Sequence, residues 1–214
     1  WADIINAAEQ FNDPGRFTTF VAYEYTSSTD DVGNLHRNVF FRGADKLPAV
    51  PFSRLNSQNP EGLWDWMATL REQGIESLAI PHNSNGSNGQ MFKLEDWAGD
   101  PMDNAYAEQR MRNDTLVEIT QVKGTSDTHP LLSPNDEWAD FEIYKFRVGT
   151  SIHSEEKGSY VREALRNGLM LESQGVENPY QCGFAAASDT HVAGTSDDEE
   201  TFFSKAGLLD GVPE

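Results

Sequence analysis

Apolar positions along the 214-residue chain follow two spacings, one helical and one of period two, and stretches of the two kinds alternate. Helical spacing, ended by Gly, Pro or polar residues, predicts helices over 1–11, 60–74, 104–112 and 160–172. Short runs rich in β-branched and aromatic residues predict strands over 17–25, 36–41, 77–80, 115–120 and 183–187. Residues 138–147 have no decisive pattern, with a helix as the first alternative.

This order of elements predicts an α/β fold with a parallel sheet or barrel. The length suits one domain with a sizeable core, and neither a linker nor a long-period repeat divides the chain. Between the predicted strand at 77–80 and the next helix, residues 81–89 form a loop rich in Asn, Gly and Ser, which we expect to be a mobile wall of a site.

The amino-acid composition argues against some classes of function. The chain has 35 acidic and 16 basic residues, a net charge of −19, which argues against a broad nucleic-acid-binding face. A small anionic substrate stays compatible with this charge if metal cations neutralise the site locally. No apolar stretch approaches the roughly 20 residues of a membrane helix. The single Cys182 excludes an intrachain disulfide and a Cys-rich zinc site.

Metal-ligand residue types stand where predicted strands meet loops. In α/β folds, functional side chains gather at the carboxyl ends of strands. The residues at these positions are Glu24, His82, Glu118 and the pair Asp189 and His191. His36 opens the next strand, the expected hairpin-like partner of the strand that contains Glu24. Carboxylate oxygens and imidazole nitrogens are ligands of zinc, manganese and iron. Together these positions predict a metal site.

Each of these residues also has a purely structural interpretation. Glu24 could be a buried acid paired with an arginine, and Glu118 could form an ion pair with Lys123. His36 could be a satisfied edge histidine, and His82 could cap a loop.

Two further residues are candidates for substrate contact. Asn83 opens the Asn/Gly loop, the natural place for substrate selection. His129 lies in a Thr-Ser-Asp-Thr-His-Pro loop, where it could contact substrate or form a turn, and we favour the turn. Cys182 has no adjacent base and is interpreted as a small buried residue rather than a nucleophile.

Five segments carry a family resemblance over nearly the whole chain. They are 21–25 (VAYEY), 34–41 (NLHRNVFF), 80–83 (IPHN), 116–120 (LVEIT) and 188–191 (SDTH). In this order they resemble a bacterial family of unknown function within the PHP (polymerase and histidinol phosphatase) superfamily of metal-dependent phosphoesterases.

The resemblance implies a distorted (β/α)7 barrel with two or three divalent metal ions, Zn, Mn or Fe, in its carboxyl-end mouth. By the same resemblance Glu24 bridges metals, His36 and His82 are ligands, and Asp189 and His191 are the terminal ligand pair. Glu118 lies in a strand that lines the pocket. Asp189 is also expected to orient the nucleophile.

One departure from the superfamily pattern affects the domain prediction. Members open with a His-x-His motif, which does not occur in this chain. The resemblance therefore implies that residues 1–214 are a single but incomplete PHP-like barrel, with its first strands upstream of Trp1 and a continuation after Glu214.

The sequence thus predicts a metal-dependent hydrolase, with a phosphoester of a small molecule as substrate and a metal-bridging hydroxide as nucleophile. A non-catalytic binding or assembly module on the same scaffold is the alternative. Hydrolysis of an amide or sulfate ester is a weaker one. Substrate identity, oligomeric state and compartment, cytoplasmic or periplasmic, stay open.

Overall fold

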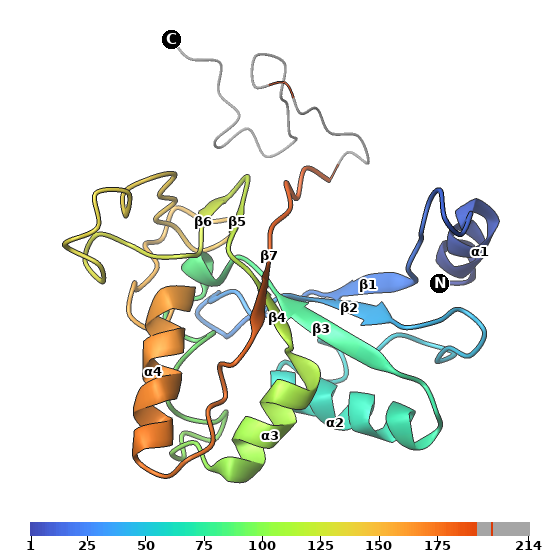
Figure 1. Ribbon diagram of the computed structural model, residues 1–214, viewed down its shortest axis with the longest axis horizontal. Coiled ribbons are helices and arrows are strands. Elements are labelled where there is room, and N and C mark those ends of the chain that lie inside the picture. The colour runs from blue at the N-terminus through green and yellow to red at the C-terminus, as the bar shows by residue number, and fades with distance from the viewer. Residues whose placement is uncertain (192–197, 199–214) are drawn as a thin grey trace.

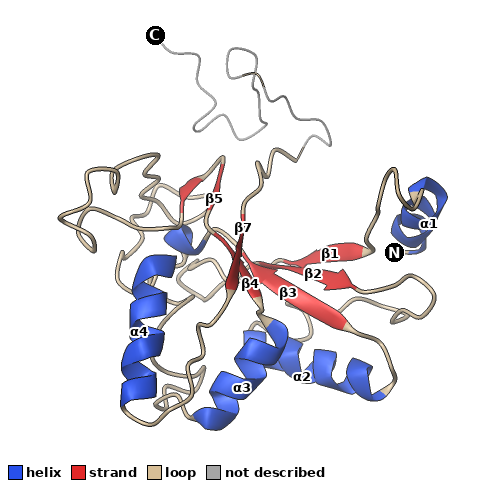
Figure 2. Ribbon diagram, viewed as in Figure 1, coloured by secondary structure: helices blue, strands red, loops and turns tan. Residues whose placement is uncertain are grey.

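A computed structural model describes residues 1–191 and residue 198 of the chain, and it consists of short sheets flanked by helices (Figures 1 and 2). The helices are α1 (Ala2–Phe11), α2 (Pro60–Glu72), α3 (Asn104–Asn113) and α4 (Val161–Ser173), with a 3-10 turn η1 (Ser84–Gly86). The strands are β1 (Ala22–Tyr25), β2 (Arg37–Phe41), β3 (Ser77–Pro81), β4 (Leu116–Glu118), β5 (Thr120–Gln121), β6 (Gly124–Thr125) and β7 (Gly183–Ala185). The predicted alternation of helices and strands is confirmed.

The main sheet has the order β1-β2-β3 and is antiparallel throughout. The expectation of parallel pairing is therefore wrong for β2 and β3, whereas the hairpin-like pairing expected of β1 and β2 is confirmed. The polar loop that joins β1 to β2 contains no helix, and antiparallel neighbours need no crossover. The segment between β2 and β3 starts and finishes at the same end of the two strands, because Phe41, the last residue of β2, pairs with Ser77, the first residue of β3. Parallel pairing does occur between β4 and β7, and β5 and β6 form a hairpin.

Helix α2 packs against one face of the main sheet. Asn59 caps the helix by accepting a hydrogen bond from the Glu61 N–H, and Pro60 takes the first turn, where a missing N–H costs nothing. The apolar stripe of α2 is buried against side chains of β1, β2 and β3; this core contains Leu63, Trp64, Met67, Leu70, Tyr25, Val39, Phe41 and Ala79. Burial of each large apolar side chain contributes about 1.5–3 kcal/mol.

A second core lies between α4, β4 and the loops that precede α3. Its buried members include Val117, Val161, Ala164, Leu171 and Tyr180. Strand β3 of the main sheet lies beside β4 (Figure 1). The described sheets do not close into a barrel, and the seven-stranded PHP-like barrel stays a prediction. None of the helices in the described part of the chain combines the length and apolarity of a membrane span.

Two segments differ from the sequence prediction. Residues 138–147 form turns, irregular chain and an isolated bridge from Phe146 to His153 rather than a helix. Their large apolar side chains Trp138 and Phe141 are exposed, so a helix here would lack a packed apolar face. The Asn/Gly/Ser loop is buried from His82 to Ser87, which contradicts the expected mobile wall. Several of its polar groups bond to other segments; for example, the Asn85 side chain donates to the Lys123 carbonyl at 3.0 Å.

Candidate metal centre

The antiparallel sheet brings three predicted ligands to the same end of its strands. Strand β1 ends there, β2 begins there and β3 ends there. Glu24 is the penultimate residue of β1, His36 immediately precedes β2, and His82 immediately follows β3. The antiparallel order therefore explains why a ligand that opens one strand meets two ligands that close its neighbours.

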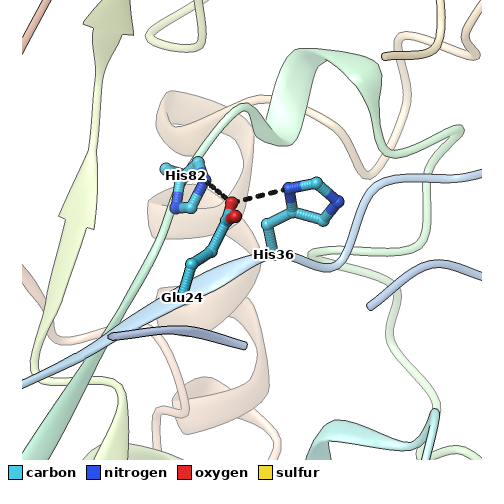
Figure 3. A group of neighbouring side chains, drawn as sticks. All are labelled: Glu24, His36 and His82. Atoms are coloured by element: carbon cyan, nitrogen blue, oxygen red, sulfur yellow. Dashed lines mark hydrogen bonds and ion pairs between the residues drawn. The ribbon is translucent and has the colours of Figure 1, made fainter. Parts of the chain in front are cut away.

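Both imidazoles point at the same carboxylate oxygen (Figure 3). His36 Nδ1 lies 2.9 Å and His82 Nε2 lies 3.0 Å from Glu24 Oε1. One ligand atom from each of the three residues lies within 4.8 Å of the others. The two rings stand edge to face, with centroids 5.7 Å apart. The structure thus brings two nitrogen donors and one oxygen donor close together.

Burial and hydrogen bonding set the charge states of this cluster. The side chains of Glu24, His36 and His82 are 38%, 20% and 5% exposed. Burial raises the pKa of Glu24, but hydrogen bonds from His36 and His82 outweigh it and hold that pKa well below its usual range. Burial lowers the pKa of His82, yet the Glu24 carboxylate and the charge of Glu118 together raise it above its ordinary value.

The donor set fits a divalent transition metal. Two imidazoles and one carboxylate are ligand types shared by zinc, manganese and iron sites. The second ring nitrogen of His82, Nδ1, is buried and has no hydrogen-bond partner among the described residues. A buried nitrogen of this kind costs free energy unless a ligand or water satisfies it. By their donor types and convergence, Glu24, His36 and His82 are the residues that would hold a metal ion.

The other two predicted ligands form a neighbouring pair. Within residues 1–191 and 198, the group of converging ligand atoms contains neither Asp189 nor His191. Instead His191 Nε2 lies 2.7 Å from Asp189 Oδ1. Asp189 Oδ2 accepts a hydrogen bond from Gln121 Nε2 at 2.9 Å and forms an ion pair with Lys123.

Asp189 nevertheless acts on the cluster electrostatically. Its charge contributes to raising the pKa of both His82 and Glu118. Burial raises the pKa of Asp189 itself, but the hydrogen bond and charge of Lys123 bring it below its ordinary value. Asp189 is thus an ionised group beside the three-residue cluster, with both carboxylate oxygens engaged.

Glu118 is a buried acid whose charge interacts with both His82 and Asp189. Its Oε1 accepts a hydrogen bond from the backbone N–H of Asn83 at 3.2 Å, directly after His82 in the chain. Burial raises the pKa of Glu118 to about 7, against the opposing charge of His82. The structural alternative of a Glu118–Lys123 ion pair is not observed, because Lys123 pairs with Asp189.

The two candidate substrate residues lie outside the group of converging ligands. Asn83 is buried in a left-handed conformation with φ of 51°, and its side-chain amide donates to Asn85 at 3.3 Å. The His129 ring packs on Tyr160 with centroids 5.5 Å apart, and its Nδ1 accepts the Leu131 N–H at 3.3 Å. This local bond fits the turn interpretation of His129.

Sequence reasoning missed Gln121 and Lys123 as neighbours of Asp189. Both belong to the β5–β6 hairpin, whose strands are too short to give a periodic signal. The one local clue is Gly124, which follows the two-residue loop with φ of 94°, a conformation that favours glycine. The spacing of residues in the sequence predicts neither the hairpin nor the contact of Lys123 with Asp189, which lies 66 residues further along the chain.

Comparison with known proteins places the chain in a family. Neither a curated protein nor a solved structure matches it. The family model described as "Protein of unknown function (DUF3604)" matches residues 1–214. The chain therefore belongs to the DUF3604 family.

Proposed function

We propose that this chain carries the metal centre of a hydrolase and that its substrate is a phosphoester. The observation that supports the proposal is the convergence of Glu24, His36 and His82 within 4.8 Å of one another. The resemblance of the same segments to the PHP superfamily, whose members are metal-dependent phosphoesterases, points in the same direction. Divalent cations bound there would lower the pKa of a water and offset the charge of a phosphoryl group.

The chain's own residues have distinct roles in this proposal. Glu24, His36 and His82 hold the metal, and their backbone positions are set by the β1-β2-β3 register. Glu118, with a pKa of about 7, can take up or release a proton near neutral pH, as a general acid or base must. Asp189 supplies a fixed negative charge next to His82.

Charge supports an anionic substrate only together with a metal. A net charge of −19 repels free phosphoesters, and the cluster itself is flanked by the acids Glu24, Glu118 and Asp189. Bound cations would reverse the local potential, so that a centre bordered by these acids becomes compatible with a phosphoryl group.

The test is an assay of the full-length protein with Zn²⁺, Mn²⁺ or Fe²⁺ against a phosphomonoester, a phosphodiester, a sulfate ester and an amide. We expect metal-dependent turnover of a phosphoester, lost in Glu24→Gln. Turnover of only the sulfate ester or the amide would keep the metal centre and overturn the substrate class. Absence of turnover together with absence of bound metal would overturn the proposal and favour a non-catalytic module.

A further inference from the structure

Lys123 occupies a fixed position at the tip of the β5–β6 hairpin. Its backbone N–H donates to Gln121 Oε1 at 3.1 Å, and its carbonyl accepts from Asn85 Nδ2 at 3.0 Å. A lysine at a hairpin tip is ordinarily solvated, but Lys123 is only 9% exposed. The hairpin and the buried Asn/Gly loop therefore fix the backbone from which this side chain extends.

The ammonium group of Lys123 is linked to the candidate metal centre through Asp189. It pairs with Asp189 Oδ2, which also accepts from Gln121 Nε2 at 2.9 Å. The charge of Asp189 in turn acts on His82, a member of the cluster. The chain thus places one lysine next to the acid that borders the centre.

The other buried cationic side chains in the described part of the chain have partners away from the candidate site. Arg37 forms a buried ion pair with Asp114 at 3.1 Å. Arg110 lies over the rings of Trp64, Phe92 and Tyr180 and donates to the Met91 carbonyl. Lys123 differs from both, because its partner Asp189 is itself a candidate site residue.

We propose that Lys123 is the residue that binds the oxyanion of the substrate, pairing with Asp189 in the free protein and with a phosphoryl oxygen in the complex. This inference rests on the proposed function. A lysine has three donors on a flexible stem, so its ammonium can exchange one oxygen partner for another without moving the hairpin. The exchange releases Asp189 Oδ2 from the ammonium and leaves it free to approach a metal ion, as the sequence predicted for this residue.

The probe is inorganic phosphate, titrated by calorimetry into the metal-loaded full-length protein. Lys123→Met removes the ammonium at similar side-chain length, and Lys123→Gln keeps a neutral donor for Asp189 as a milder change. Loss of a charge-assisted hydrogen bond weakens binding by about tenfold or more. We expect this loss of phosphate affinity in both variants and none in Lys157→Met, the same substitution at an exposed lysine.

Metal content, measured on the same samples, separates this inference from the proposed function. Unchanged phosphate affinity in Lys123→Gln with metal still bound would overturn the role of Lys123 and leave the metal centre intact. Loss of metal from the lysine variants would make Lys123 a residue that only positions Asp189, which also overturns the inference. Absence of metal from the wild type would instead contradict the proposed function.

Discussion

His82 Nε2 lies 3.0 Å from Glu24 Oε1, although 58 residues separate them in sequence. The contact follows from the register of the sheet, which pairs Glu24 with Asn38 and Asn38 with Ile80. His82, two residues beyond Ile80, therefore lies on the same face of the sheet as Glu24 and at the same end of the strands. A metal ion bound here would replace the contact between the two side chains.

The first prediction concerns the pH dependence of metal binding. The pKa of His82 is raised above its ordinary value, chiefly by the Glu24 carboxylate against the lowering effect of burial. A proton on His82 competes with a metal ion, so affinity should rise with pH through the raised pKa and each binding event should release protons. Calorimetry of Zn²⁺ binding in buffers of different ionisation enthalpy measures this release. A pH-independent affinity between about pH 6 and 8 would contradict it.

Glu118 should make the metal-free protein less stable as pH rises. Its pKa is about 7 in the folded chain, above the ordinary 4.5 of a glutamate, because burial disfavours the charged form. The stability that this group provides is fully present below about pH 4.5 and is lost as pH rises through 7. The loss is on the order of 3 kcal/mol.

Glu118→Gln removes this titration and keeps the acceptor for the Asn83 N–H. We expect the variant to be more stable than the wild type at about pH 8 and no more stable at about pH 4. Urea unfolding of both proteins at the two pH values measures the difference. An equal stability difference at both would show that Glu118 does not titrate in this range.

Asp114 should be a strong determinant of stability. Its carboxylate is buried, pairs with Arg37 at 3.1 Å and accepts from the Trp64 indole at 3.0 Å. Asp114→Asn leaves the buried guanidinium without its counter-charge, which costs about 3–5 kcal/mol. The matched control Asp13→Asn breaks an exposed pair with Arg16 and should cost less than about 1 kcal/mol. Comparable free energies of unfolding for the two variants would refute the role of the buried pair.

Gly124→Ala should displace the hairpin that carries Lys123. A Cβ at this position would lie 2.6 Å from the Cβ of Tyr144 and 2.9 Å from the Glu142 carbonyl oxygen, at φ of 94°. Gly149 has φ of 73° and no atom within 4 Å of its Cβ position, so Gly149→Ala reports the backbone strain alone. We expect Gly124→Ala to lower the unfolding free energy by about 1–3 kcal/mol more than Gly149→Ala. Thermal denaturation of both variants tests this; equal melting temperatures would argue against the close contact.

The core of the candidate site could be predicted from sequence because it depends on strand ends. Glu24, His36 and His82 flank short β-branched or aromatic runs, and such runs fix both a strand and its boundary. The strand directions could not be read in the same way, because pairing is decided by how the chain returns to the sheet. The convergence holds even though β3 pairs with β2 in the antiparallel direction and not in the expected parallel one.

The surroundings of the site could not be predicted, because they depend on partners distant in sequence. Asp189 carries a ligand-type side chain, but its contact with Lys123 depends on a hairpin with two-residue strands. The loop after His82 has the composition of a mobile segment, yet it is buried from His82 to Ser87, and partners from other segments satisfy several of its polar groups. Composition predicts solvation only where such partners are lacking.

Metal binding by purified, chelator-treated protein tests the central claim most directly. Zn²⁺ would be titrated into the wild type, Glu24→Gln, His36→Gln and the control His153→Gln, whose imidazole is exposed and lies outside the cluster. We predict that the wild type and His153→Gln bind Zn²⁺ with equal affinity. Each of the two ligand variants should bind it at least about tenfold more weakly. Equal affinity in all four proteins, or no binding by the wild type, would contradict the assignment of Glu24, His36 and His82 as a metal centre.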